Sequence, residues 1–152
     1  MDSPAGETCR NVKPGGGCAA YATRPTICRT FLCQWMLKPA LPENFRPDLC
    51  GVMLSADGSP DRPCLLASCD PADPEAWRRE PMHGFLKHQS RTQWPRLAVM
   101  AAAGRRYWLI TPDEDCDLGE VPPGYGIEVD QFADGRADVR MSPRPDRTTV
   151  LK

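Results

Sequence analysis

The chain has 152 residues, of which 41% are hydrophobic and 26% charged, and its formal net charge is −1. This length predicts a single domain, and the small net charge disfavours nucleic acids and acidic membranes as partners. No apolar run approaches the roughly 20 residues that span a bilayer. The first residues lack the basic and apolar parts of a secretory signal, so a cytoplasmic location is expected.

Cysteine and proline are unusually frequent. Proline accounts for 17 residues, well above its usual share of about 5%. Five of the eight cysteines fall within residues 1–50, where there is little periodic apolar pattern. Clustered thiols in a reducing compartment more often bind metal or take part in redox chemistry than form structural disulfides. A bound metal would also supply folding free energy that this segment otherwise lacks.

Residues 9–50 are therefore expected to form a loop-dominated, cysteine-rich lobe with one short helix. Thr23 can cap this helix, because a threonine hydroxyl accepts hydrogen bonds from the first free N–H groups. Pro25 suits the first turn, where its missing N–H costs nothing. The residues that follow, Thr26 to Trp35, contain no helix breaker and continue the helix.

From Gly51 onward the sequence predicts strands joined by tight turns. Alternating apolar and polar residues, interrupted by glycine, aspartate and proline, indicate three β-hairpins. The third contains an Asp-Gly pair at positions 134–135, which suits the positive φ angles of a hairpin turn. The paired segments are residues 51–55 with 63–68, 97–100 with 107–110, and 125–130 with 136–140.

One longer helix is predicted between the first and second hairpins. It begins at Asp73-Pro74, which supply a cap and a first-turn proline, and it runs to about Gln89. Pro81 and Gly84 indicate that this helix is broken or starts late. The acidic residues 113–120 are expected to be a solvated loop, because their glycine does not fall where a calcium-binding loop requires it.

Together these elements predict an α+β fold. The cysteine-rich lobe, residues 9–50, packs on a mostly antiparallel sheet of hairpins with one longer helix, residues 51–141. Both parts belong to one domain, residues 1–141. The polar, proline-containing residues 142–152 are expected to form a disordered tail.

The first four cysteines are spaced Cys9-x8-Cys18-x9-Cys28-x4-Cys33. Only the last interval falls within the two to four residues typical of zinc knuckles. On one continuous helix, Cys28 and Cys33 would lie about 140° apart around the axis. Joint binding of an ion by these two cysteines therefore requires the helix to end or bend near Phe31.

The other candidate ligands have weaker support. Cys64 and Cys69 are five residues apart on a predicted strand, so they are expected on opposite faces, which disfavours joint binding. Cys50 is either an additional ligand or an ordinary residue at the start of a strand. His83 and His88 do not share a helical face, so a surface or packing role is expected for both.

The stretch from Gly17 to Trp35, GCAAYATRPTICRTFLCQW, resembles the YkgJ-type family of zinc- or iron-chelating domains. The characteristic stretch of that family reads roughly G-C-x-x-Y-x-x-R-P-x-x-C-R-x-F-x-C and usually follows an earlier cysteine. The family also has closely spaced N-terminal cysteines that this sequence lacks, so either the start is shortened or four cysteines hold a single ion. The resemblance covers about residues 9–50 and implies that the metal ligands are Cys9, Cys18, Cys28 and Cys33.

The expected function is therefore metal binding in a structural or metal-handling role, with zinc favoured over iron. Four protein ligands leave no open position for a substrate, which argues against hydrolysis. Arg24 and Arg29 would offset the negative charge of the thiolates. A single ion ranks above an iron–sulfur cluster, because Met36 stands where the ferredoxin spacing requires a cysteine.

Two other classes of function stay open. One is a metal- or thiol-dependent enzyme that modifies proteins, and the other is a redox sensor whose thiols form a reversible disulfide. The sequence contains no P-loop, Rossmann or serine-hydrolase motif and no evident Cys–His nucleophile pair. These patterns identify no substrate and no protein partner.

Overall fold

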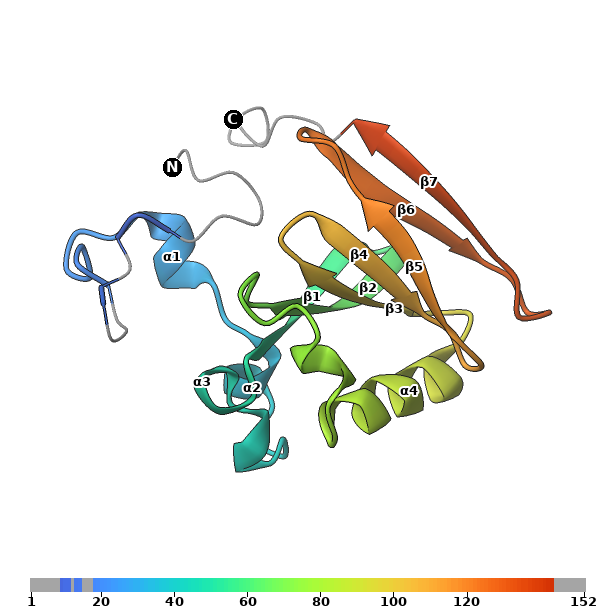
Figure 1. Ribbon diagram of the computed structural model, residues 1–152, viewed down its shortest axis with the longest axis horizontal. Helices are drawn as coiled ribbons and strands as arrows, with labels where there is room; N and C mark the ends of the chain where they lie inside the picture. The colour runs from blue at the N-terminus through green and yellow to red at the C-terminus, as the bar shows by residue number, and fades with distance from the viewer. Residues whose placement is uncertain (1–8, 12, 15–17, 144–152) are drawn as a thin grey trace.

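The computed structural model describes residues 9–11, 13–14 and 18–143. In this part of the chain, four α-helices, a five-stranded mixed sheet and a two-stranded antiparallel sheet form an α+β fold (Figure 1), which confirms the predicted fold class. The helical elements are α1 (Thr26–Thr30), α2 (Gln34–Leu37), η1 (Glu43–Phe45), α3 (Pro47–Cys50), η2 (Ala76–Arg78) and α4 (Met82–Gln93). The strands are β1 (Val52–Ser59), β2 (Arg62–Cys69), β3 (Ala98–Ala103), β4 (Arg106–Ile110), β5 (Asp115–Glu120), β6 (Tyr125–Gln131) and β7 (Ala137–Pro143). None of the described helices has both the length and the apolar character needed to cross a membrane.

The described part of the lobe contains three short α-helices, α1, α2 and α3, where the sequence predicted one. The predicted helix stops at Thr30, and α2 begins only at Gln34. Between them, Cys33 has an extended backbone with φ −78° and ψ 163°. Short helices are marginal without an apolar face to bury, and Phe31 and Leu32 at the interruption are both exposed.

The five-stranded sheet has the order β1-β2-β3-β4-β5. All neighbouring strands are antiparallel except β2 and β3, which are parallel. Parallel neighbours require a long crossover connection, and η2 and α4 supply it. The pairs β1–β2, β3–β4 and β6–β7 confirm the three predicted hairpins.

The longer helix starts late, as its prolines indicated. Residues 76–78 form a single 3₁₀ turn, and α4 begins at Met82, directly after Pro81. Proline lacks the N–H that an interior helical position needs, and it restricts the residue before it. The crossover between β2 and β3 is therefore divided into a short turn and one regular helix.

Most of the acidic segment predicted to be a solvated loop is instead strand β5, which begins at Asp115. It pairs with β4, so that Leu109 lies opposite Cys116. One of its carboxylates, that of Asp117, forms an ion pair with Arg106 on the neighbouring strand. The loop prediction was wrong because the backbone of β4 holds this edge strand, whereas its own side chains carry little apolar pattern.

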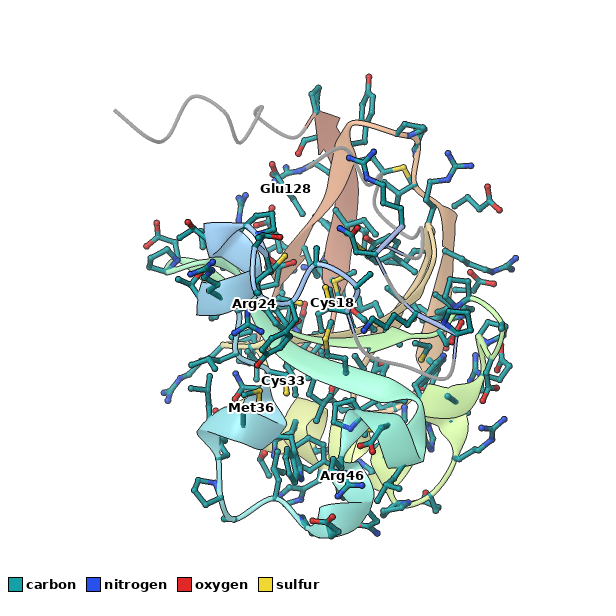
Figure 2. The ribbon with its side chains drawn as sticks, turned by 90° about the vertical axis from the view of Figure 1, so that its left-hand side faces the viewer. Cys18, Arg24, Cys33, Met36, Arg46 and Glu128 are labelled. Carbon is teal, nitrogen blue, oxygen red and sulfur yellow. The ribbon has the colours of Figure 1, made fainter. Side chains whose placement is uncertain are left out.

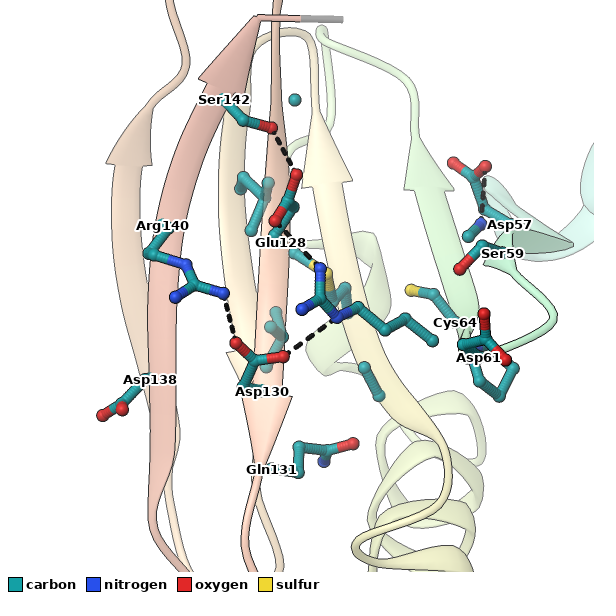
Figure 3. A pocket seen from close by; sticks show the side chains of 18 of the residues that line it. Asp57, Ser59, Asp61, Cys64, Glu128, Asp130, Gln131, Asp138, Arg140 and Ser142 are labelled. Carbon is teal, nitrogen blue, oxygen red and sulfur yellow. Dashed lines mark hydrogen bonds and ion pairs between the residues drawn. The ribbon is translucent and has the colours of Figure 1, made fainter.

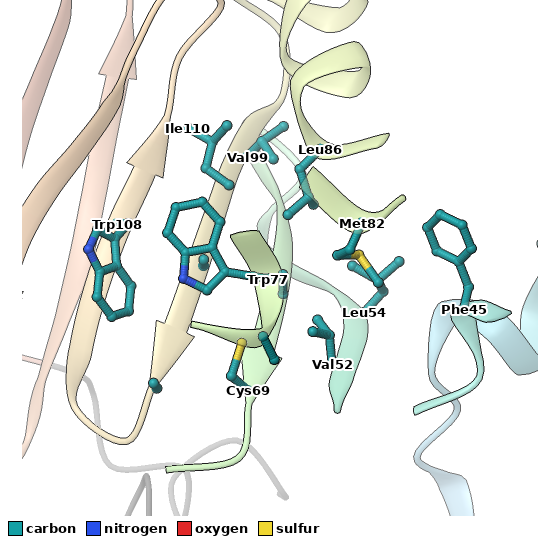
Figure 4. Close-up of a cluster of buried hydrophobic side chains, with 14 residues drawn as sticks. Phe45, Val52, Leu54, Cys69, Trp77, Met82, Leu86, Val99, Trp108 and Ile110 are labelled. Carbon is teal, nitrogen blue, oxygen red and sulfur yellow. The ribbon is translucent and has the colours of Figure 1, made fainter. Parts of the chain in front are cut away.

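The core lies between one face of the five-stranded sheet and the crossover helices (Figure 4). Trp77 is fully buried there, and its ring centroid lies 5.6 Å from that of Trp108. Burying a large apolar side chain of this kind contributes about 1.5–3 kcal/mol. Phe45 joins the same cluster and packs edge-on against Phe85, with 5.2 Å between the ring centroids. The core thus includes the C-terminal end of the lobe.

The ribbon formed by β6 and β7 is a separate two-stranded sheet. The indole Nε1 of Trp94 donates a hydrogen bond to the carbonyl oxygen of Phe132 over 2.8 Å, which joins the end of α4 to the ribbon. Strand β7 runs to Pro143, so it takes in the first two residues of the predicted tail. Residues 144–152 lie outside the described residues.

Candidate functional site

Two of the predicted ligands lie on neighbouring segments of the lobe. The backbone N–H of Ala19 donates a hydrogen bond to the carbonyl oxygen of Asn11, with 2.7 Å between nitrogen and oxygen. This contact places the segment of Cys18 beside the segment that contains Cys9. Both side chains are half-buried thiols, so two predicted ligands are carried on adjacent backbone segments.

The other two predicted ligands lie on either side of the interruption between α1 and α2. Cys28 is part of α1 and is half-buried, whereas Cys33 directly precedes α2 and is buried. Figure 2 views the molecule from the side of the lobe and labels Cys18 and Cys33. Because α1 ends at Thr30, one straight helix does not hold the last two thiols apart. The helix thus ends near Phe31, as joint binding of an ion by these two cysteines would require.

The four thiols are not gathered into a finished site. Within residues 9–11, 13–14 and 18–143, no three histidine, cysteine, aspartate or glutamate side chains are grouped closely enough to hold a metal ion. The donor set nevertheless suits zinc or iron, because both ions are commonly bound by four thiolates. Binding through these four cysteines would require the lobe to close around the ion.

Before Cys33, the described side chains of the lobe form no apolar core. Among its described side chains none is buried, and the large apolar ones are exposed: Tyr21 by 64%, Phe31 by 47% and Leu32 by 46%. The cysteines in the same stretch are half-buried. Apolar burial therefore contributes little to holding this segment in place.

The two arginines next to the predicted ligands make different contacts. The guanidinium of Arg29 donates from Nε to the carbonyl oxygen of Arg24 over 2.9 Å and from Nη2 to that of Ala22 over 3.0 Å. The guanidinium of Arg24 instead lies over the ring of Tyr21, 4.1 Å from its centroid. Arg29 thus binds the backbone of the loop before α1, whereas Arg24 stacks on an aromatic side chain.

The cysteines of the sheet are poor candidates for metal binding. Burial raises the pKa of Cys64 to about 12, with a further contribution from Asp57, and burial raises the pKa of Cys69 to about 11. These raised pKa values disfavour the thiolate form that a metal ligand requires. The Sγ of Cys50 lies 3.3 Å from the carbonyl oxygen of Val52, to which it donates a hydrogen bond.

A cleft of about 870 Å³ lies between the five-stranded sheet and the ribbon (Figure 3). Arg62 crosses it, with 2.9 Å from Nη1 to Oε2 of Glu128 and 2.9 Å from Nε to Oδ1 of Asp130. The hydroxyl of Ser142 donates to Glu128 over 2.7 Å, and this hydrogen bond, together with Arg62, lowers the pKa of Glu128. Arg140 completes the network by pairing with Asp130. The network joins the ribbon to the β1–β2 hairpin.

A second charged cluster surrounds Asp115 on β5. Its Oδ1 lies 2.9 Å from Nζ of Lys87, and its Oδ2 lies 2.9 Å from Nε2 of His83 and 3.2 Å from Nη1 of Arg78. Burial opposes ionisation of Asp115, but the hydrogen bonds from Lys87 and His83 outweigh it and lower the pKa. The cluster ties α4 and η2 to the edge strand. His83 contributes to this packing through its contact with Asp115.

Neither charged cluster was predicted from the sequence. The alternating pattern of residues 125–130 does place Glu128 and Asp130 on one face of a strand. Their partner Arg62 lies 66 positions before Glu128, and no periodicity links residues so far apart.

The chain matches no family model, no curated protein and no solved structure. The resemblance of residues 17–35 to metal-chelating domains therefore stays a prediction.

Proposed function

We propose that this protein binds one metal ion, zinc rather than iron, through four cysteines of its N-terminal lobe. The ligands are Cys9, Cys18, Cys28 and Cys33, and the proposed compartment is the reducing cytoplasm, with no nucleic acid as partner. None of the eight cysteines forms a disulfide, which supports a role that requires thiolates. The interruption after α1 also supports the proposal, because it frees Cys33 from the helix of Cys28.

The observation that carries the proposal is the absence of an apolar core among the described residues before Cys33. A segment that buries no described apolar side chain gains little free energy from folding. Metal binding can supply that free energy, because the ion binds only the folded arrangement of its ligands. The half-buried cysteines are then the groups around which the segment becomes ordered.

The proposed role is structural or concerned with metal handling. Four protein ligands fill a tetrahedral site and leave no position for water or substrate. The cleft at Arg62 and the cluster at Asp115 lie on other elements, where their charged groups are paired with one another. Neither cluster supplies a group to the proposed metal site.

The first test is the metal content of untagged protein purified without chelator. We expect about one equivalent of a colourless metal per chain. An absorbing brown sample would identify iron instead. A sample without metal whose free-thiol count falls by two on mild oxidation would replace the proposal with a redox sensor.

The second test assigns the ligands by substitution. Cys28→Ser should lose metal and make residues 18–32 more susceptible to proteolysis. Cys64→Ser is the matched control, because Cys64 is a thiol on β2 with a pKa raised to about 12. Equal loss of metal from both variants would show that the ligands are wrongly assigned.

A further inference from the structure

We propose that Arg29 positions the loop between Cys18 and Cys28 for metal binding, and that it does so through its shape and hydrogen bonds rather than its charge. This inference rests on the proposed function. Arg29 directly follows the predicted ligand Cys28 on α1. It is a positioning residue, because its guanidinium contacts the loop backbone.

The evidence is a pair of hydrogen bonds from one guanidinium to one loop. Nε donates to the carbonyl oxygen of Arg24 over 2.9 Å, and Nη2 donates to the carbonyl oxygen of Ala22 over 3.0 Å. Both acceptors lie between the two predicted ligands. Because the guanidinium is planar and rigid, it fixes the loop and the helix relative to each other.

The described side chains of this segment contribute no apolar packing that could fix the loop. Helix α1 has five residues, a length at which an isolated helix is not stable. The carbonyl oxygen of Pro25 accepts hydrogen bonds from the N–H groups of Cys28 and Arg29 and so forms the first turn of the helix. No described side chain from Cys18 to Leu32 is buried, so hydrogen bonds replace apolar packing there.

The consequence for metal binding is entropic. Without the two hydrogen bonds, the loop samples more conformations, and the ion must supply the free energy to order it. Removing them should therefore weaken metal binding by about tenfold, the equivalent of one to two surface hydrogen bonds. Lysine at this position keeps the positive charge but presents a single ammonium on a flexible stem, which cannot reproduce the two-pronged contact.

Arg24 provides the matched control. It is a cation in the same loop, but its guanidinium lies over Tyr21. The carbonyl oxygen of Arg24 that accepts from Arg29 belongs to the backbone, so a change of side chain leaves the acceptor in place. Arg24→Lys should therefore change the affinity by less than about threefold, which is the scale of an exposed cation–π contact.

The experiment measures Zn²⁺ affinity by competition with a chromophoric chelator on the reduced full-length chain. Co²⁺ serves as a spectroscopic probe of how many thiolates bind. We expect Arg29→Lys and Arg29→Gln to weaken Zn²⁺ binding alike, with an unchanged thiolate count. Thermal unfolding of the sheet should be the same in all variants, which excludes a general loss of fold.

Two results would overturn the inference while leaving the proposed function intact. If Arg29→Lys binds Zn²⁺ as tightly as the unaltered chain while Arg29→Gln does not, the charge of Arg29 is what matters. If both variants bind as the unaltered chain does, the loop contact has no role in metal binding. Failure of the unaltered chain to bind either ion would overturn the proposed function and this inference together.

Discussion

The Nε2 atom of His83 lies 2.9 Å from Oδ2 of Asp115, and this contact ties α4 to the edge strand β5. The other oxygen of the same carboxylate lies 2.9 Å from Nζ of Lys87. The carboxylate of Asp115 on β5 thus contacts two side chains of helix α4, those of His83 and Lys87. The strand that carries it has little apolar pattern of its own, so these charged contacts help to set where it packs.

Asp115→Asn should lower the free energy of unfolding by about 1–2 kcal/mol, because it leaves Lys87 and His83 without their common anion. Urea unfolding near neutral pH measures this difference. Glu120→Gln on the same strand is the control, since Glu120 is largely exposed and its contact with Arg105 is 3.9 Å long. A control variant as unstable as Asp115→Asn would contradict the assigned role of the cluster.

The stabilisation from Asp115 should depend on pH. The pKa of Asp115 is lowered in the folded state, so its contribution is complete above the unfolded aspartate value of about 3.9 and is lost as pH falls through the lower folded value. The difference in stability between the unaltered chain and Asp115→Asn should therefore shrink as the pH falls below about 4. A difference that grew over the same acid range would show that the pKa of Asp115 is not lowered in the folded protein.

Arg62→Ala should loosen the β6–β7 ribbon without unfolding the sheet. Its ion pairs to Glu128 and Asp130 are exposed and are screened by salt. Amide hydrogen exchange should therefore become faster on β6 and β7, while the midpoint of urea unfolding stays nearly constant. Arg136→Ala is the control, because Arg136 pairs with Asp134 within one turn. Equal changes in exchange for both variants would show that Arg62 does not join the ribbon to the sheet.

Cys64 and Cys69 should resist alkylation in the folded protein. Burial raises the pKa values of both thiols, and only the thiolate reacts. With metal removed, iodoacetamide at about pH 8 should label the half-buried lobe cysteines Cys9, Cys18 and Cys28 first. Mass spectrometry of the digested protein identifies the labelled positions, and labelling in denaturant gives the total. Rapid labelling of Cys64 in the folded chain would contradict its raised pKa.

Leu86→Ala should lower stability by about 2–5 kcal/mol, because Leu86 is fully buried in the core. Leu32→Ala is the control: Leu32 is 46% exposed and lies in the lobe. Thermal or urea unfolding should separate the two variants clearly. Similar losses would indicate that the segment around Leu32 is packed more tightly than its exposure shows.

Much of the fold could be predicted from local pattern. The three hairpins follow from alternating residues that flank turn-forming ones, and the late start of α4 follows from Pro81. The opposite faces of Cys64 and Cys69 also follow, because side chains alternate along a strand. In the structure Cys69 lies in the core and Cys64 lines the cleft.

The sequence by itself determined the elements whose cause lies within a few residues: turns, hairpins, the helix start and the spacing of the cysteines. Only the tertiary structure decided the parallel pairing of β2 with β3, the edge strand β5 and the partners of Arg62 and Asp115. These depend on segments far apart in the chain, and no local periodicity encodes which of them meet. The same reason explains the two arginines of the lobe: adjacency to a cysteine suggested a shared electrostatic role, but the folded loop directs Arg29 to backbone carbonyls and Arg24 to an aromatic ring.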